Sequence, residues 1–263
     1  MPTGLPPITS QSVTVTRHIV PSYTARQLAH RDQIDWHDHA EQQLVYARAG
    51  VLVASTDAGT WLLPPQRALW LPAEVPHAHQ AHGVTDMRTV IFPRSEIAHG
   101  YDRPTVLAVS PLMREAIIAL TQDELAQREQ HHIRRVVLDQ LRPLPDGAFY
   151  LPEPSDDRLL AINAMLHEDP ADARTLRQFG LVVGAAERTL SRLFRDQTGM
   201  TFPQYRAQVR LHHGLRRLAS GMPVTAVAHE CGYANASAFV EAFRLATGTT
   251  PGAYQRSLAG AYR

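Results

Sequence analysis

Cysteine is almost absent from this chain of 263 residues, which contains only Cys231. A single cysteine excludes an internal disulfide and agrees with a reducing compartment such as the cytosol. Cys231 lies in a segment with helix-turn-helix spacing, so we expect its thiol to pack in a core, and a reactive thiol is the alternative.

Long apolar runs are also missing. The sequence has no stretch of 18 apolar residues, and its first twenty residues lack a basic start followed by an apolar run. A membrane-spanning helix needs about 20 apolar residues, and a secretory signal needs that basic-then-apolar order. We therefore expect a cytoplasmic protein with no membrane partner, long enough for two domains with hydrophobic cores.

Lysine does not occur at all, so all 26 basic residues are arginine. Residues 1–172 contain 14 arginines and 21 acidic residues, a net charge of −7, whereas residues 173–263 contain 12 arginines and four acidic residues, a net charge of +8. A basic segment on an acidic remainder predicts a polyanionic partner at the C-terminal end only.

The basic segment contains two copies of one helical pattern. Leu190 and Phe194 fall on one face of a predicted helix, and Phe239 and Phe243, each 49 positions later, repeat that face. This repetition predicts two helix-turn-helix units in tandem.

A glycine precedes each of these two helices, Gly184 in the first unit and Gly232 in the second. Glycine allows the positive φ that such a turn requires without steric cost. The spacing from this glycine to the helix is one residue longer in the second unit, so the repeat slips by one position at the turn.

The opposite faces of the two helices carry polar or charged side chains and one valine. They are Arg188, Ser191, Arg192 and Arg195 in the first helix and Ser237, Val240, Glu241 and Arg244 in the second. A helix of this size fits the major groove of double-stranded DNA, where arginine can donate two hydrogen bonds to guanine or to a phosphate. The alternative is a solvated basic helix in an ordinary bundle, and the doubled pattern favours DNA binding.

Several motifs of this segment resemble the DNA-binding domain of AraC/XylS-type transcriptional regulators. They are Gly199-Met-Thr-Phe-Pro-Gln-Tyr, Pro223-Val-Thr-Ala-Val-Ala-His-Glu-Cys-Gly-Tyr, and Gly248-Thr-Thr-Pro-Gly-Ala-Tyr. The resemblance implies that both recognition helices enter successive major-groove segments on one face of the duplex.

The sequence departs from this family at two positions of the first unit. Gly180 stands where alanine is usual, and Ala186 stands at the N-cap of the recognition helix, where serine is usual. Loss of an N-cap side chain costs about 1 kcal/mol, so we expect the first recognition helix to be held less firmly than the second, which has Asn235 at its cap.

Residues 16–100 consist of short apolar runs separated by Gly, Pro or Asp, which predicts β-structure in a barrel or sandwich. Within this region, a pattern of His37, His39, Gln43 and later His77 resembles the two motifs of a cupin barrel. The resemblance implies that these four side chains converge and bind an effector or a metal. It departs from the pattern at Gln43, where enzymatic cupins usually have glutamate.

Chemistry leaves the role of these residues open. His37 and His39 are two positions apart, so on a strand both point to one face, and imidazoles with an amide oxygen can hold a divalent transition metal. The alternative is a polar barrel mouth without metal. We do not expect His79 or His82 to be direct ligands. The three tryptophans (Trp36, Trp61 and Trp70) could line an effector pocket, although core packing is the simpler role.

Residues 105–142 have a helical pattern, with Ser110 as a cap and a second helix over 123–141 that His131-His132 interrupts. This region either forms a dimer interface or only packs on the barrel. Residues 143–147 and 151–155 read as loops.

A helix is then expected over 156–168 and a long one over 202–220. Nineteen residues at 1.5 Å each give roughly 28 Å, close to one turn of DNA of about 34 Å.

These patterns predict an α+β multidomain protein with a cupin-like sensor domain (1–104), a helical linker or dimerisation region (105–154) and an all-α DNA-binding domain (155–263). We expect a sequence-specific transcriptional regulator, not an enzyme, that responds to a small-molecule effector or a metal. RNA polymerase and a second copy of the chain are partners that the sequence leaves open. The competing hypotheses are a metal-dependent cupin enzyme carrying a DNA-binding domain and a sequence-blind architectural DNA protein.

Overall fold

The computed structural model describes residues 14–18, 21–96, 101–122, 124–144, 147 and 149–260, with the backbone alone at 259 and 260. Two compact units divide the chain: residues 61–144 and the described residues before 58 belong to the first, and residues 58–60 and 147–256 belong to the second. We call them the sheet unit and the helical unit.

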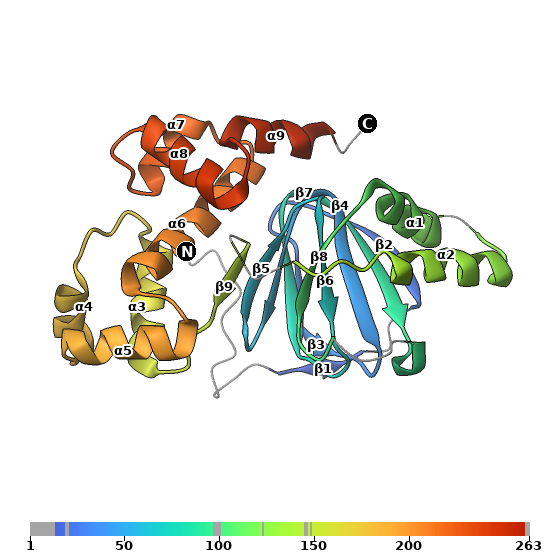
Figure 1. Ribbon diagram of the computed structural model, residues 1–263, viewed down its shortest axis with the longest axis horizontal. Helices are drawn as coiled ribbons and strands as arrows, with labels where there is room; N and C mark the ends of the chain where they lie inside the picture. The colour runs from blue at the N-terminus through green and yellow to red at the C-terminus, as the bar shows by residue number, and fades with distance from the viewer. Residues whose placement is uncertain are drawn as a thin grey trace. The chain divides into compact units, whose positions relative to one another are not determined.

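The sheet unit is built on two long antiparallel strands, β4 (Gln42–Thr56) and β7 (His77–Phe92). Strand β7 also pairs with β2 and β3, and β4 pairs with β6, which in turn pairs with β8, while β1 runs parallel to β3. The other strands are β1 (Thr16–Arg17), β2 (Tyr23–Leu28), β3 (Gln33–Asp38), β5 (Gly59–Leu63), β6 (Arg67–Leu71) and β8 (Thr105–Ala108). Figure 1 shows these strands curving around a shared interior, as the sequence predicted.

Strand β8 corrects the expectation that residues 105–142 are entirely helical. Val106 and Leu107 are buried, and Leu107 pairs with Ala68 of β6. A four-residue apolar run does not distinguish strand from helix by its periodicity, and here the free edge of β6 decides the outcome.

Helices α1 (Pro111–Gln122) and α2 (Gln127–Asp139) pack against the sheet through one apolar cluster (Figure 1). This cluster joins Trp70 and Phe92 of the sheet to Ile117 and Leu120 of α1 and Val137 of α2. One face of each helix is thus committed to the sheet.

The starts of these helices follow their caps. The Ser110 hydroxyl accepts a hydrogen bond from the Met113 N–H at 3.1 Å, as predicted. Helix α2 begins at Gln127, later than expected, and His131-His132 does not interrupt it, because both imidazoles are exposed and leave the backbone hydrogen bonds intact.

All three tryptophans are buried, at 0 to 4% exposure. Trp70 packs against Phe92 with the rings tilted and their centroids 5.2 Å apart, and it donates its indole N–H to the Gln42 amide oxygen at 3.1 Å. Core packing thus accounts for Trp70.

The helical unit begins with the short strand β9 (Tyr150–Pro152), where the sequence suggested a loop. Leu151 is buried in the core of this unit, and the Tyr150 hydroxyl donates to the Ala58 carbonyl oxygen at 2.8 Å. Such long-range pairing is invisible in a three-residue segment that contains proline.

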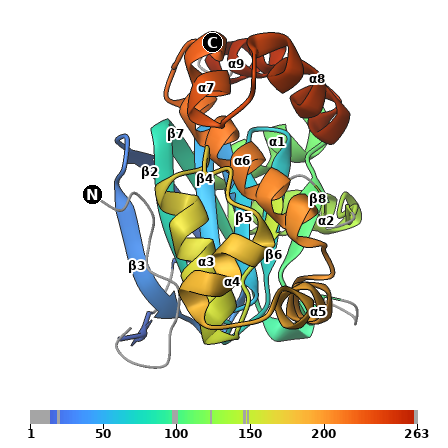
Figure 2. The ribbon, with the colours of Figure 1, turned by 90° about the vertical axis from the view of Figure 1, so that its left-hand side faces the viewer.

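The helices of this unit follow the expected order up to the second helix-turn-helix, and a further helix that the sequence pattern did not predict comes after it. They are α3 (Asp157–Glu168), α4 (Leu176–Val183), α5 (Glu187–Thr198), α6 (Phe202–Ala219), α7 (Val224–Glu230), α8 (Ala236–Thr247) and α9 (Pro251–Gly260). Figures 1 and 2 both show α6 running from the α3–α5 group to the α7–α8 group. Its 18 residues span about 27 Å at 1.5 Å per residue.

Candidate functional site

The first helix-turn-helix consists of α4 and α5, joined at Gly184. Gly184 has a φ of 67°, in the left-handed region that favours glycine. Leu190 and Phe194 of α5 are fully buried. Four predicted DNA-contacting residues occupy the opposite face of α5, with the three arginines exposed and the serine half-buried: Arg188, Ser191, Arg192 and Arg195. The sequence thus separated the two faces of α5 correctly.

The second unit consists of α7 and α8, and Gly232 turns the chain between them with a φ of 70°. Phe239 and Phe243 are buried. On the opposite face of α8, three of the predicted contact residues are exposed and the valine is half-buried: Ser237, Val240, Glu241 and Arg244. This face is less basic than that of α5, because Glu241 accepts a hydrogen bond from Arg244 at 3.0 Å.

The N-caps of the two recognition helices differ as expected. The Asn235 side-chain oxygen accepts a hydrogen bond from the Ala238 N–H at 2.9 Å, whereas Ala186 makes no side-chain cap. One of the free N–H groups at the start of α5 therefore lacks the partner that its counterpart in α8 has.

The structure explains why position 180 in α4 is glycine and not alanine. A Cβ atom added there would lie 2.3 Å from the Ala185 carbonyl oxygen, a distance that no real Cβ contact shows. The turn between α4 and α5 passes so close to α4 that alanine would force it outward.

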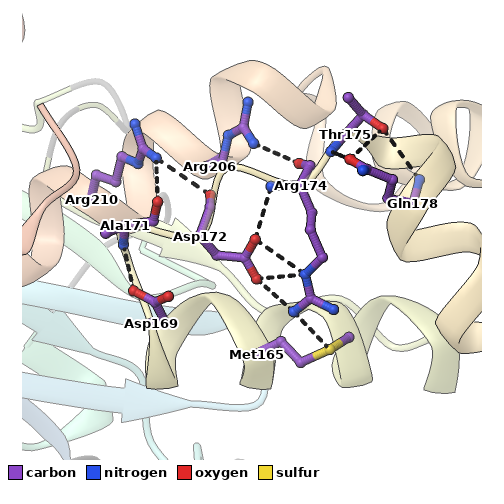
Figure 3. Close-up of polar contacts among 9 residues, drawn as sticks. All are labelled: Met165, Asp169, Ala171, Asp172, Arg174, Thr175, Gln178, Arg206 and Arg210. Atoms are coloured by element: carbon purple, nitrogen blue, oxygen red, sulfur yellow. Dashed lines mark hydrogen bonds and ion pairs between the residues drawn. The ribbon is translucent and has the colours of Figure 1, made fainter. Parts of the chain in front are cut away.

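Arginines of α6 fasten the loop that leads into α4 (Figure 3). Arg206 donates to the Arg174 carbonyl oxygen and Arg210 to the Pro170 carbonyl oxygen, both at 2.8 Å. The Asp172 carboxylate accepts hydrogen bonds from the Arg174 guanidinium. Because these bonds favour the charged carboxylate, they hold the pKa of Asp172 below its usual value. We call Arg174, Arg206 and Arg210 the arginine clamp; the sequence missed it, because a charge count does not show which arginines bind within the domain.

The first helix-turn-helix also borders a hollow of about 470 Å³. Ser191 and Arg195 of α5 lie in its wall, together with Thr175 and Thr201, the N-cap residues of α4 and α6. Backbone N–H groups at helix N-termini favour anions, but Glu187 also lines the hollow, and the N–H groups of Thr175 and Thr201 already donate to Gln178 and Gln204.

Cys231 lies in the core of the second unit, as expected. Its side chain is buried, its thiol lies 3.3 Å from the Arg210 carbonyl oxygen, and burial raises its pKa to about 12. A thiol with such a pKa is not ionised at neutral pH and is therefore a poor nucleophile.

In the sheet unit, the four predicted effector residues come together. His37 and His77 face each other across β3 and β7, with ring centroids 4.2 Å apart, and the ring of His39 lies 5.1 Å from that of His77. The Nε2 atom of His39 lies 3.0 Å from the Gln43 side-chain oxygen. All four residues are buried. They therefore suit a specific site in the interior that the curved strands enclose.

His79, which we did not expect to be a direct ligand, lies in the same cluster. It follows His77 by two positions on β7, so both side chains point to the same face. The ring nitrogens of His37, His77 and His79 lie within 4.8 Å of one another. The sequence contains a signal that would have identified His79. Its spacing from His77 is the same as the spacing between His37 and His39. His82, in contrast, lies near His30, with ring centroids 6.1 Å apart.

Burial keeps the imidazoles of His37, His77 and His79 neutral. It lowers the pKa of His77 to about 3, lowers that of His79 well below its usual value and lowers that of His37. Each imidazole therefore retains one nitrogen lone pair at neutral pH.

Comparison with protein families identifies two matches. The profile of the AraC-like ligand binding domain matches residues 20–202, and that of a helix-turn-helix domain matches residues 182–257. Within the part of the chain that the structure describes, no helix is long and apolar enough to cross a membrane.

Individual relatives agree with these profiles. The HTH-type transcriptional regulator NimR of Escherichia coli (strain K12) is 32% identical over 224 residues, which cover 83% of this chain and 81% of NimR. The HTH-type transcriptional regulator RipA of Corynebacterium glutamicum is 34% identical over 103 residues, which cover 39% of this chain and 31% of RipA. Among solved structures, ToxT from Vibrio cholerae is 9% identical, with a TM-score of 0.41 over 91% of this chain and 100% of that one.

Proposed function

Because the chain belongs to the AraC-type transcriptional regulators, which join a ligand-binding domain to a helix-turn-helix domain, we propose that α5 and α8 read one DNA site together and that the histidine cluster senses the effector. The histidine cluster comprises His37, His39, His77 and His79 with Gln43.

The repeated pair of recognition helices carries the DNA part of this proposal. Each presents an exposed face opposite a buried one. Helix α6, which joins the two helix-turn-helix units, is about 27 Å long, close to one turn of DNA at about 34 Å. Arg188, Arg192 and Arg195 are exposed and suit guanine edges or phosphates. Glu241 can accept a hydrogen bond from a cytosine amino group, so the two half-sites would differ in sequence.

Fluorescence anisotropy with DNA tests the recognition helix. With the full chain and a site selected from random DNA, we expect Arg192→Ala to weaken binding by about 1–3 kcal/mol if the arginine contacts guanine, and to relax specificity at that base pair. A phosphate contact would instead lower affinity evenly across sequences and reduce the salt slope by about one unit.

Arg26→Ala is the matched control, because Arg26 is an exposed arginine of β2. Wild-type affinity in both Arg192→Ala and Arg188→Ala would contradict the assignment of α5.

The chain's other properties follow from the same proposal. We assign it no catalytic reaction, since the matched relatives are named transcriptional regulators, and we place it in the cytoplasm.

We propose that residues 1–104, 105–154 and 155–263 are the sensor, linker and DNA-binding regions, although α1 and α2 belong to the same compact unit as the sheet. We further propose that a second copy of the chain packs on the outer face of α1, where Leu112 is 57% exposed, and that RNA polymerase is another partner.

A further inference from the structure

We propose that the sheet unit binds a divalent transition-metal ion through His37, His77 and His79, with a fourth position open to an anionic ligand. The inference rests on the proposed sensing role of the histidine cluster and names its chemistry. It differs from the arrangement that the cupin-like motif implied, because His79 takes the place of His39 and Gln43.

Unpaired nitrogens in the interior are the first observation. Nε2 of His77 and both ring nitrogens of His79 are buried and have no hydrogen-bond partner among the residues that the structure describes. Buried polar atoms are nearly always paired, because leaving one unpaired costs free energy. An ion bound here would give a partner to two of these atoms, Nε2 of His77 and one nitrogen of His79.

Backbone carbonyl groups orient two of the three rings. Nδ1 of His37 lies 2.8 Å from the Asp35 carbonyl oxygen, and Nδ1 of His77 lies 2.8 Å from the Val75 carbonyl oxygen. A carbonyl oxygen only accepts, so Nδ1 carries the proton and the lone pair is on Nε2. Metal-binding histidines are characteristically held in this way.

Geometry allows the three nitrogens to share one ion. The ligand nitrogens lie within 4.8 Å of one another, and a tetrahedral ion with metal–nitrogen distances of about 2.0–2.1 Å needs them about 3.3 Å apart. We expect the side chains to draw together by up to about 1.5 Å when the ion binds.

Both ring nitrogens of His39 already have hydrogen-bond partners in the protein. Its Nδ1 donates to the Glu41 carbonyl oxygen at 2.7 Å, so its Nε2 is the acceptor that faces the Gln43 amide. Gln43 then donates its amide N–H to His39, with the oxygen and nitrogen of the amide exchanged, an assignment that hydrogen bonding decides. His39 and Gln43 thus form a pair beside the ion, and three imidazoles hold it.

Charge determines what the fourth position accepts. Three neutral imidazoles leave both positive charges of the ion uncompensated, so a carboxylate or another anion is favoured as the additional ligand. His18, which is exposed and stacks on His37 at 4.8 Å, marks the side of the cluster nearest solvent.

Cobalt substitution tests the ligand set. The full chain, purified without a histidine tag and stripped by a chelator, is titrated with Co²⁺, whose visible absorption reports four-coordinate binding. We expect one Co²⁺ per chain in the wild type and in His39→Ala, and at least a hundredfold weaker binding in His79→Ala, since even loss of a supporting residue costs 10–100-fold. His132→Ala, on the exposed face of α2, is the control for surface histidines.

Folding is checked by circular dichroism, and His79→Gln replaces His79→Ala if the latter does not fold. Wild-type protein that binds no stoichiometric Co²⁺, or a folded His79 variant that binds like the wild type, would overturn the ligand set. Specific DNA binding is measured on the same samples. Its absence in both metal-free and Co²⁺-treated wild type counts against the proposed function, whereas intact DNA binding by a wild type that binds no Co²⁺ counts against the metal site alone.

The open position has its own readout. Acetate should change the absorption of the Co²⁺ protein, and acetamide, of similar size but neutral, should not. Equal responses to both, or to neither, would reject the anion preference.

Discussion

At the scale of single residues, Gly180 shows how one methyl group can reverse a general rule. Glycine within a helix is normally about 1 kcal/mol less favourable than alanine. Here the carbonyl oxygen of Ala185 occupies the space that a methyl group would need, at 2.3 Å. The contact is with backbone, which cannot rotate away as a side chain can.

We therefore expect Gly180→Ala to destabilise the helical unit by about 1–3 kcal/mol, measured as the free energy of urea unfolding. The control is Ala207→Gly in α6, an exposed position, which should follow ordinary propensity and lose about 1 kcal/mol. An increase in stability for Gly180→Ala would show that the turn can move aside.

At the scale of elements, the two recognition helices have the same faces but unequal starts. The capping bond of Asn235 in α8 has no equivalent at Ala186 in α5. Since the N-terminal residues of such a helix lie nearest the bases, fraying at this end affects reading as well as stability.

The caps predict two opposite outcomes. Ala186→Ser should stabilise the helical unit by about 1 kcal/mol, and Asn235→Ala should destabilise it by a similar amount. Thermal unfolding of both variants beside the wild type measures this, and a destabilised Ala186→Ser would mean that α5 begins in a geometry that cannot use the cap.

Helices with local signals could be predicted from the sequence. Ser110, Thr201 and Asn235 mark the starts of α1, α6 and α8, and turn glycines mark both helix-turn-helix units. Strands β8 and β9 could not be predicted, because their pairing partners are distant in sequence.

The candidate site likewise contains residues that a sequence pattern predicts and residues that only the folded chain brings together. Four members of the histidine cluster were predicted from the spacing of the cupin-like motifs, and His79 was missed although its spacing from His77 repeats that of His37 and His39. The arginine clamp depends on which carbonyl groups lie nearby after folding, which no count of charges contains.

At the scale of the whole molecule, α6 fixes the distance over which DNA can be read. It packs against α3, α5 and α7, and the clamp ties it to the loop before α4. The two recognition helices therefore belong to one compact unit, and a flexible linker does not join them.

This arrangement predicts how the DNA site tolerates insertions. Half-sites read by α5 and α8 should lie about one helical turn apart, about 10 base pairs. Inserting five base pairs turns one half-site to the opposite face, and inserting ten adds about 34 Å, which α6 cannot span. We expect each insertion to weaken binding at least tenfold in anisotropy assays, and retained affinity with ten added base pairs would reveal a flexible α6.

The burial of Cys231 has a practical consequence for spectroscopy. The only cysteine of the chain is buried and its pKa is raised to about 12. We therefore expect thiol-directed reagents to react with it only slowly. The native sequence therefore serves as an almost silent background for site-directed labelling. One cysteine introduced on each unit, at exposed positions such as Gln27 and Ser220, would carry a pair of spin labels whose separation reports the response of the protein to effector, metal and DNA.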